Sequence, residues 1–195
     1  MKKTIILFIL IFLYGQQSFA TTQVPDKIKY LGKDLPLEGA PLNAYKWKTG
    51  RKPFFHVECS CNWRGHVAHW EVKDGKLFLI GIDAKIITTD KTNIKTFSPL
   101  TKSVYKKAQI EDLFSEVHEE GRVFASWFTG KLRIGSGKIV KSVSFGGFCR
   151  YYDREIHLQI QHGVILSELV KEFTAESAVE EWRRQIKDFN KIQNN

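Results

Sequence analysis

The stretch WEVKDGKLFLI, residues 70–80, constrains the fold more strongly than any other part of the chain. Two apolar runs flank Asp74-Gly75, a dipeptide typical of two-residue hairpin turns because both positions accept a positive φ. Counting outward from the turn gives the pairs expected on the two faces, which are Val72–Leu77, Trp70–Leu79 and Ala68–Gly81 on one and Glu71–Phe78, His69–Ile80 and Val67–Ile82 on the other. Because both faces are largely apolar, the pattern predicts a hairpin inside a sheet, covered on both sides, with Trp70 in the core.

The rest of the chain alternates short β-type runs with turn residues. Strands are expected within residues 27–37, 52–59, 122–134, 138–145 and 154–169. The last of these segments reads as a second hairpin that turns at His162-Gly163. Its apolar residues alternate with polar ones from Glu155 onward, so one face should be dry and the other wet.

Two segments instead have the three- and four-residue apolar spacing of helices. One is residues 109–117, and the other is the tail, which Thr174 can cap and whose stripe runs from Ala178 to Ile192. Together these patterns predict an α+β fold, with a mainly antiparallel sheet of about eight short strands, a short mid-chain helix and a C-terminal amphipathic helix packed on the sheet. Residues 21–195 suffice for a single domain, with a lysine-rich insert at about residues 85–107.

The first twenty residues have the layout of a signal peptide. Lys2 and Lys3 precede an apolar run over residues 4–14, and Ser18 and Ala20 stand three and one positions before the expected cut. We therefore expect cleavage after Ala20 and a periplasmic or secreted mature chain. The apolar run is too short for a stable anchor, and no other stretch approaches spanning length, so no transmembrane segment is expected in the mature chain.

The chain carries an excess of positive charge. Its formal net charge is +9, or +7 without the two lysines of the signal segment, and residues 85–107 hold six lysines against one aspartate. Such a surface can simply be solvated, or it can attract an anionic ligand or another exported protein with an acidic surface. Arginine-rich stripes with interleaved aromatic residues are absent, so no nucleic acid is expected as a partner.

An odd number of cysteines, three, leaves at least one of them without an intramolecular partner. On a strand, Cys59 and Cys61 would share one face with their Cβ atoms too far apart to join. The expected disulfide therefore links Cys149 to Cys59 or Cys61. A metal site would add His66 and His69 in the pattern C-x-C-x4-H-x2-H, which matches no common zinc spacing, so no metal and no cofactor are expected.

Arg64, His69 and Glu71 are the candidate ligand-binding residues. Arg64 precedes Gly65, where a carboxylate or phosphate could approach closely. An ion pair from Arg64 to Glu71 or Asp83 is the simpler alternative. His69 and Glu71 share a strand face and could act together in acid–base chemistry, although a packed histidine is again simpler. The chain has no G-x-S-x-G, H-E-x-x-H, P-loop or dinucleotide motif, so no residue is assigned a catalytic role.

Three segments resemble a family of uncharacterised bacterial proteins. The family pattern is a W-R-G-x-x-A-x-W-E-[IV] hairpin, then a W-F-x-G-x-L-R segment, then a late E-[IL]-x-L strand. The matching positions in this chain are Trp63, Arg64, Gly65, Ala68, Trp70, Glu71, Trp127, Phe128, Gly130, Leu132, Arg133, Glu155, Ile156 and Leu158. The resemblance spans most of residues 28–170, and it implies no activity because none is attached to the pattern.

Two functions from different classes fit these observations. The first is a non-enzymatic exported binding protein, such as an inhibitor or an immunity-like partner of another exported protein. The second is a small hydrolase that works through His69, Glu71 and Arg64. A deep pocket where these three side chains converge would favour the hydrolase, whereas a shallow basic surface with exposed aromatic residues would favour binding. The absence of catalytic motifs makes the binding protein the expectation.

Overall fold

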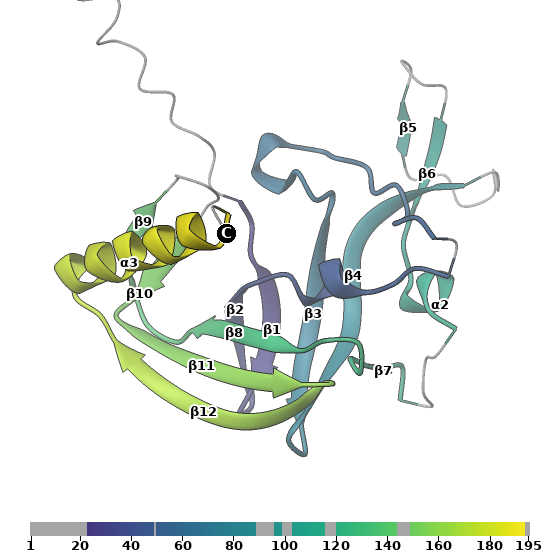
Figure 1. The fold of residues 1–195 in the computed structure, drawn as a ribbon. Helices are drawn as coiled ribbons and strands as arrows, with labels where there is room; N and C mark the ends of the chain where they lie inside the picture. Colours follow the sequence, from purple (N-terminus) through teal and green to yellow (C-terminus); the bar gives the residue numbers. More distant parts are fainter. Residues whose placement is uncertain are drawn as a thin grey trace, which may run out of the picture.

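The structure is a computed structural model of the whole chain (Figure 1). It describes residues 23–48, 50–88, 96–98, 103–115, 120–143 and 149–193. The predicted signal peptide lies outside the described residues. The predicted lysine-rich insert is described in part, and those parts belong to strands, so they continue the sheet and do not form a separate loop.

The chain is rich in strands, as predicted. Its main sheet, however, closes into a barrel and is not a simple open sheet. Within the described residues its ten strands are β1 (Asp26–Tyr30), β2 (Lys33–Glu38), β3 (His66–Lys73), β4 (Lys76–Thr88), β5 (Thr96–Ser98), β6 (Ser103–Lys107), β7 (Val123–Phe124), β8 (Gly130–Gly135), β11 (Arg154–Gln161) and β12 (Val164–Glu172). They follow the order β12-β11-β8-β2-β1-β3-β4-β6-β5, with β7 beside β4. All pairs are antiparallel except β1–β3, which is parallel.

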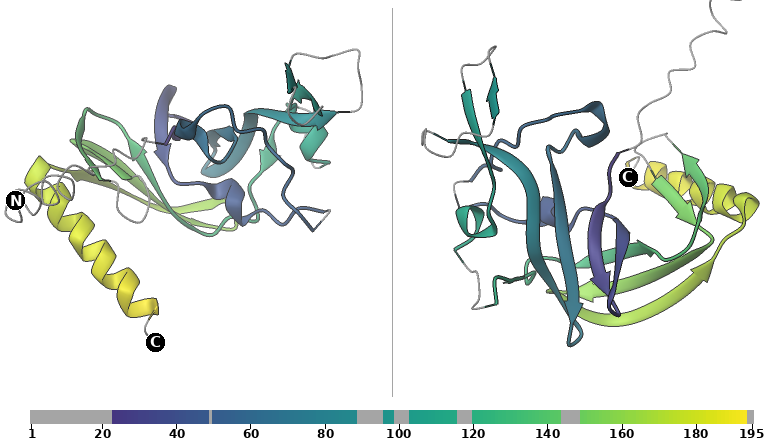
Figure 2. Two further views of the ribbon diagram at one scale, coloured as in Figure 1. Left: turned by 90° about the horizontal axis from the view of Figure 1, so that it is seen from above. Right: turned by 180° about the vertical axis from the view of Figure 1, so that it is seen from behind.

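The barrel closes where the second hairpin meets the turn of the first. The backbone N–H groups of Leu77 and Ile165 donate to the carbonyls of Gly163 and Gly75, each at 2.8 Å. From behind, β3 and β4 form one wall, and β8, β11 and β12 curve round to meet it (Figure 2). Closure depends on contacts between residues about ninety positions apart, which local patterns do not encode.

The β3–β4 hairpin confirms the predicted register near its turn. Asp74 and Gly75 both have positive φ, of 51° and 70°, and Trp70 lies opposite Leu79. A register shift between His69 and Trp70 makes the expected pairing wrong farther from the turn: His69 faces Gly81, not Ile80, and Ala68 and Val67 are each shifted by one as well. Such a bulge bends the strand and increases its twist, which a barrel of this size requires.

Trp70 has no exposed surface, so its predicted place in the core is confirmed. The inward faces of β1, β2, β3, β4, β8 and β11 supply most of the remaining core, with Ile28, Leu37, Leu77, Leu79, Leu132, Ile134, Leu158 and Ile160 almost completely buried. The expectation that both faces of the β3–β4 hairpin are covered is wrong for β3, because His69 and Glu71 on its outer face keep part of their surface exposed.

A second, smaller sheet covers part of the barrel wall. It pairs β9 (Ile139–Val143) with β10 (Cys149–Tyr152). The C-terminal helix α3 (Ala175–Gln193) lies on this small sheet and not on the main one, which corrects its expected position (Figures 1 and 2). Thr174 caps the helix as predicted, because its Oγ1 accepts a hydrogen bond from the backbone N–H of Ser177 at 3.2 Å.

Two further expectations are wrong in extent. The mid-chain helix α2 has only one turn (Ile110–Leu113), because Phe114 already has extended backbone angles. Residues 52–59 form no strand; Phe55 makes a single bridge to Ile86, and the connection from β2 to β3 otherwise contains two short 3₁₀ turns, η1 (Pro41–Ala44) and η2 (Ser60–Asn62). Proline and glycine at 41, 50 and 53 interrupt this connection and explain why the apolar run does not extend as a strand.

Candidate functional site

His69 and Glu71 share one face of β3, as predicted, and this is the outer face of the strand, but each side chain has its own polar partners. Nε2 of His69 lies 2.7 Å from Oδ2 of Asp83 on the neighbouring strand β4. Glu71 contacts Nζ of Lys29 at 3.8 Å and Nε of Arg122 at 3.3 Å. The two side chains share a face without contacting a common group, so the geometry does not combine them into an acid–base pair.

Asp83 is the acidic member of the His69 pair. Partial burial opposes its ionisation, but the hydrogen bond from His69 and the positive charges of Lys107 and Lys27 outweigh it and lower the pKa of Asp83. His69 borders two hollows of the outer surface, of about 520 and about 390 Å³. Neither hollow is lined by the other two candidates, and the pair is open to solvent, with 28% of the His69 side chain exposed.

Arg64 turns away from both candidates and pairs with a different acid from those considered. Its Nη1 lies 2.9 Å from Oδ1 of Asp26, which has no exposed surface, and its Nη2 donates to the carbonyl of Val24 at 2.9 Å. Asp26 also accepts hydrogen bonds from the Trp70 indole and the Ala68 backbone, both at 3.2 Å. This pair forms because β1 and β3 run parallel, which brings the start of β1 beside the start of β3.

Burial changes the pKa of the Asp26 carboxyl group. Desolvation raises its pKa even though Arg64 and the two N–H donors favour the charged form. Removing Arg64 would therefore leave a buried carboxylate without a counter-charge. Arg64 is thus a structural partner inside the barrel, and the structure separates it from His69 and Glu71.

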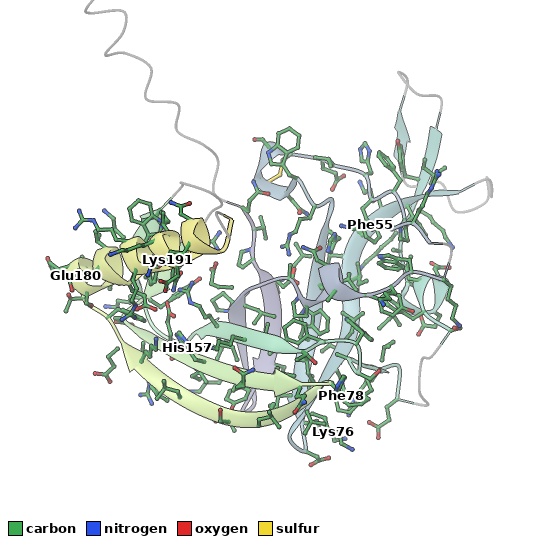
Figure 3. All side chains as sticks on the ribbon, in the orientation of Figure 1. Phe55, Lys76, Phe78, His157, Glu180 and Lys191 are labelled. Carbon is green, nitrogen blue, oxygen red and sulfur yellow. A yellow bond between two sulfur atoms is a disulfide. The ribbon has the colours of Figure 1, made fainter. Side chains whose placement is uncertain are left out.

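The predicted disulfide is wrong. Cys59 is bonded to Cys61, with a Cα–Cα distance of 5.2 Å, and this disulfide is the yellow bond in Figure 3. Cys149 is a free, half-buried thiol. The expectation assumed an extended strand, but Ser60–Asn62 form a 3₁₀ turn that folds the two cysteines toward each other. The Sγ atom of Cys149 instead accepts a hydrogen bond from Nη1 of Arg133 at 2.8 Å.

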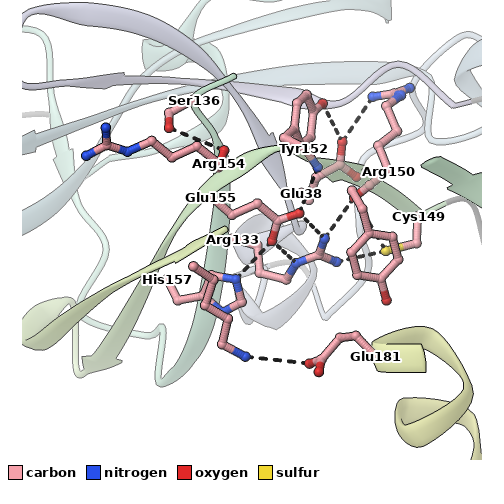
Figure 4. A network of polar contacts seen from close by, with 12 residues as sticks. Glu38, Arg133, Ser136, Cys149, Arg150, Tyr152, Arg154, Glu155, His157 and Glu181 are labelled. Atoms are coloured by element: carbon pink, nitrogen blue, oxygen red, sulfur yellow. Dashed lines mark hydrogen bonds and ion pairs between the residues drawn. The ribbon is translucent and has the colours of Figure 1, made fainter. Parts of the chain in front are cut away.

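A buried polar network between the barrel and the small sheet contains residues that the sequence did not single out as a site (Figure 4). Arg133 on β8 donates to both carboxylate oxygens of Glu155 on β11, at 2.8 and 3.0 Å, and to the carbonyl of Arg150 on β10 at 2.8 Å. His157 contacts the same carboxylate at 2.9 Å. Figure 3 shows His157 on the side of the barrel that faces α3.

Glu155 corrects the expectation that its strand face is wet, since its side chain has no exposed surface. Burial opposes ionisation, but hydrogen bonds from His157, Arg133 and the Tyr152 backbone hold the pKa of Glu155 at about 2. The ionised carboxylate therefore joins two layers of the fold. Arg133 ends the segment WFTGKLR and Glu155 begins the segment EIHL, two of the segments singled out in the sequence, although neither residue was assigned a role there.

The connection between β2 and β3 presents a surface of a different kind. We call it the basic loop surface and define it by its exposed cations and aromatic residues, Lys46, Lys48, Arg51, Lys52, Phe54 and Trp63. Phe54 is 63% and Trp63 is 70% exposed, and residues 43–57 contain no acidic residue. In Figure 1 this connection crosses in front of β3 and β4 toward α2 and then returns to the start of β3.

The basic loop surface is braced by contacts beneath it. Gly65 has a φ of 69°, and a Cβ atom there would lie 2.6 Å from the carbonyl oxygen of Phe55, so the backbones of the two segments touch. Phe55 is buried, and Nζ of Lys52 lies 5.3 Å from the centre of its ring. The Cys59–Cys61 bond closes the other end of the segment. These contacts hold the backbone that carries Phe54 and Trp63 in one conformation.

The two histidines of the considered metal pattern do not converge. His66 is buried, with Nδ1 donating to the carbonyl of Arg64 at 2.9 Å, whereas His69 lies on the outer face. Nowhere in the described part of the chain do three or more His, Cys, Asp or Glu side chains gather closely enough to hold a metal ion. No helix among the described residues is both long and apolar enough to cross a membrane.

Comparison of the chain with models of protein families, with curated proteins and with solved structures finds no match.

Proposed function

We propose that the protein is an exported, non-enzymatic binding protein that engages an acidic surface of another exported protein through the basic loop surface. The observation that carries the proposal is the 63% exposure of Phe54 within residues 43–57, which hold four cations and no acid, together with the 70% exposure of Trp63 later in the same connection. Tryptophan is among the residues that contribute most when an interface forms. The cations would increase the association rate with an acidic partner.

The bracing of this segment supports the proposal in a second way. Binding is weakened when a flexible loop must first be ordered, and a preformed backbone avoids that loss. The disulfide Cys59–Cys61, the close contact of Gly65 with Phe55 and the ion pair Arg64–Asp26 each restrict the loop. The first of these is also the kind of bond that persists in an oxidising compartment, in agreement with export.

The arrangement of the three candidate residues favours binding over the hydrolase. Arg64, His69 and Glu71 would need to face one substrate, but each has a separate polar partner and they line no common hollow among those described above. A general base within reach of a substrate proton is the minimum requirement for such catalysis. The proposed role of these residues is to hold the strands beneath and beside the loop.

Export has its own test. The mature protein isolated from cells should begin at Thr21, as read by N-terminal sequencing, and it should be recovered from the periplasm or the medium. A soluble cytoplasmic protein that begins at Met1 would contradict this part of the proposal. The result does not depend on whether the basic loop surface binds anything.

Binding can be tested by placing a photo-crosslinking amino acid at Phe54, at Trp63 or at Ile139. Ile139 is the matched control because it is 55% exposed and lies on the small sheet. We expect crosslinks to one exported protein from positions 54 and 63 but not from 139. With that protein purified, Trp63→Ala should lower the affinity at least tenfold, or about 1.4 kcal/mol. Equal crosslinking from all three positions, or an unchanged affinity, would contradict the proposed surface.

A further inference from the structure

One margin of the main sheet is left open along most of β12. This nine-residue strand pairs with β11 over its full length, but on its other side it meets β4 only at Val164. Among the described residues nothing else pairs with that side from Leu166 to Glu172. In Figure 1, β12 forms the outermost strand of its layer, with a free lower margin.

The backbone of this open margin has free hydrogen-bonding groups. The N–H of Phe173 donates to the carbonyl of Asp153 at 2.9 Å, so residue 173 points its backbone toward the β11 side. Successive residues of a strand alternate in this direction. The backbone N–H and C=O groups of Glu168, Val170 and Glu172 therefore point outward to solvent, in the spacing with which an additional strand pairs.

The side chains along this margin are unusually apolar for an edge strand. Leu166 and Leu169 are each 58% exposed, and Val170 is 41% exposed. Edge strands are commonly protected by outward charges that discourage pairing. Here the carboxylate of Glu168 turns inward to accept a hydrogen bond from the hydroxyl of Tyr30 at 2.5 Å.

Besides Glu168, β12 carries two charged side chains, Lys171 and Glu172, and only Glu172 is available to recognise a partner. Nζ of Lys171 is directed to α3, where it lies 3.6 Å from Glu181. Glu172 is exposed and forms no ion pair with any residue that the structure describes. Leu169 faces the opposite side of β12 from Val170 and Glu172, so a segment that alternates cations, one of them opposite Glu172, with apolar residues beside Leu169 would complement this margin in charge and in polarity.

We propose that β12 accepts an extended, cationic and apolar segment of a partner protein as an added strand. Main-chain hydrogen bonds to residues 168, 170 and 172 would supply much of the affinity, and the side chains would set the specificity. This interaction surface is separate from the basic loop surface and is independent of what that surface binds.

A second copy of this chain fits the margin less well than such a segment. Symmetric antiparallel pairing of two β12 strands can be centred on any one of the residues 168–171. Three of these four registers place like charges opposite each other: Glu168 against itself, Glu168 against Glu172, or Lys171 against itself. An unlike, positively charged strand avoids all three repulsions.

The probe for the test is a synthetic peptide of alternating lysine and valine, capped at both ends, with a glutamate–valine peptide as the charge-reversed control. Amide hydrogen exchange of the mature protein is followed by NMR. We expect the lysine peptide to protect the amides of Glu168, Val170 and Glu172 at least tenfold, and the glutamate peptide to protect them much less. The Glu172→Gln variant should lose most of this preference.

Val170→Pro removes one outward N–H without removing a hydrogen bond to β11, and it should weaken the binding of the lysine peptide at least tenfold. Val170→Lys is a second variant that keeps the amide and repels the cationic strand. Trp63→Ala is the matched control and should bind the peptide like the unaltered protein, so failure of the loop proposal leaves this result intact.

Three outcomes would overturn the inference. The first is no protection of the three amides at millimolar peptide. The second is binding that Trp63→Ala abolishes and the Val170 variants do not. The third is a concentration-dependent dimer, seen by sedimentation and lost in Val170→Pro, which would assign the margin to a second copy of the chain.

Discussion

Arg133 on β8 and Glu155 on β11 form a bidentate ion pair, with N–O distances of 2.8 and 3.0 Å, around a carboxylate that has no exposed surface. The same guanidinium reaches the carbonyl of Arg150 and stacks 4.6 Å from the ring centre of Tyr151, both on β10. This pair is thus one link between the barrel wall and the small sheet that carries α3; Glu38 on β2, which bonds Arg150 and Tyr152 of β10, is another.

Replacing Glu155 by glutamine should be strongly destabilising. The substitution leaves the guanidinium of Arg133 buried without its counter-charge, which costs about 3–5 kcal/mol of unfolding free energy. Denaturation in urea at neutral pH measures the change. Glu172→Gln is the matched control, because Glu172 is exposed and should change stability by no more than about 0.5 kcal/mol. Equal, small changes in both variants would contradict the structural role of the pair.

The structure also explains which parts of the fold can be predicted from the sequence. The β3–β4 hairpin is predictable because the Asp74-Gly75 turn and its alternating neighbours are local features. The barrel closure is not, since it depends on where the second hairpin meets the first. The bulge at His69 is equally hidden, because one extra residue on β4 changes the pairing without changing the composition of either strand.

The candidate residues show the same limit. The sequence identifies Arg64, His69 and Glu71 as charged or titratable, but it cannot show that a parallel β1–β3 contact brings Asp26 beside Arg64. Glu155 alternates with apolar residues and therefore resembles a solvent-facing position, until a second layer of sheet covers it. The basic loop surface can be recognised only from the exposed fractions of its side chains. These fractions depend on tertiary packing, which the sequence does not show.

The environment of His66 leads us to expect that the protein is less stable in mild acid. Its Nδ1 donates to the carbonyl of Arg64, and its buried Nε2 has no hydrogen-bond partner among the described residues, so nothing there accepts the second proton of a charged ring. Burial, and to a lesser degree the charges of Lys52 and Arg64, lower the pKa of His66 to about 4, and the carbonyl only partly opposes them. The unfolded chain would therefore bind a proton between about pH 6.5 and 4 that the folded chain excludes.

This difference in proton binding makes the folded protein less stable as the pH falls. The contribution of His66 to stability is fully present above about pH 6.5 and is lost as the pH falls toward 4, by roughly 3 kcal/mol in total. His66→Phe keeps a ring against Phe55 and removes the titration, so its unfolding free energy should vary less over this range. His162→Asn, on the exposed β11–β12 turn, controls for the loss of an imidazole. A His66→Phe profile as steep as that of the unaltered protein would contradict the assignment.

The cysteine pairing predicts which thiol reacts. In the exported protein, unfolded without reductant, only Cys149 should be alkylated, because Cys59 and Cys61 are bonded to each other. Peptide mapping under non-reducing conditions measures this, and Cys149→Ser should abolish the labelling. The short loop closed by the bond implies a modest stabilisation, roughly 1–2 kcal/mol in the chain-entropy model. A peptide that joins Cys149 to either of the other two would contradict the structure.

Trp70 and Trp63 offer a matched comparison of a core residue with a surface residue of the same type. Trp70 has no exposed surface and donates its indole N–H to Asp26, whereas Trp63 is 70% exposed. Trp70→Ala should lower the unfolding free energy by about 3–5 kcal/mol, because it opens a cavity beneath the hairpin and removes a donor from a buried carboxylate. Trp63→Ala should change it by no more than about 0.5 kcal/mol, while reducing partner binding. Thermal melts and urea titrations of both variants decide the matter: a Trp70→Ala protein as stable as the unaltered one would show that the hairpin is not core, and a large loss of stability in Trp63→Ala would show that this residue supports the fold and not an interface.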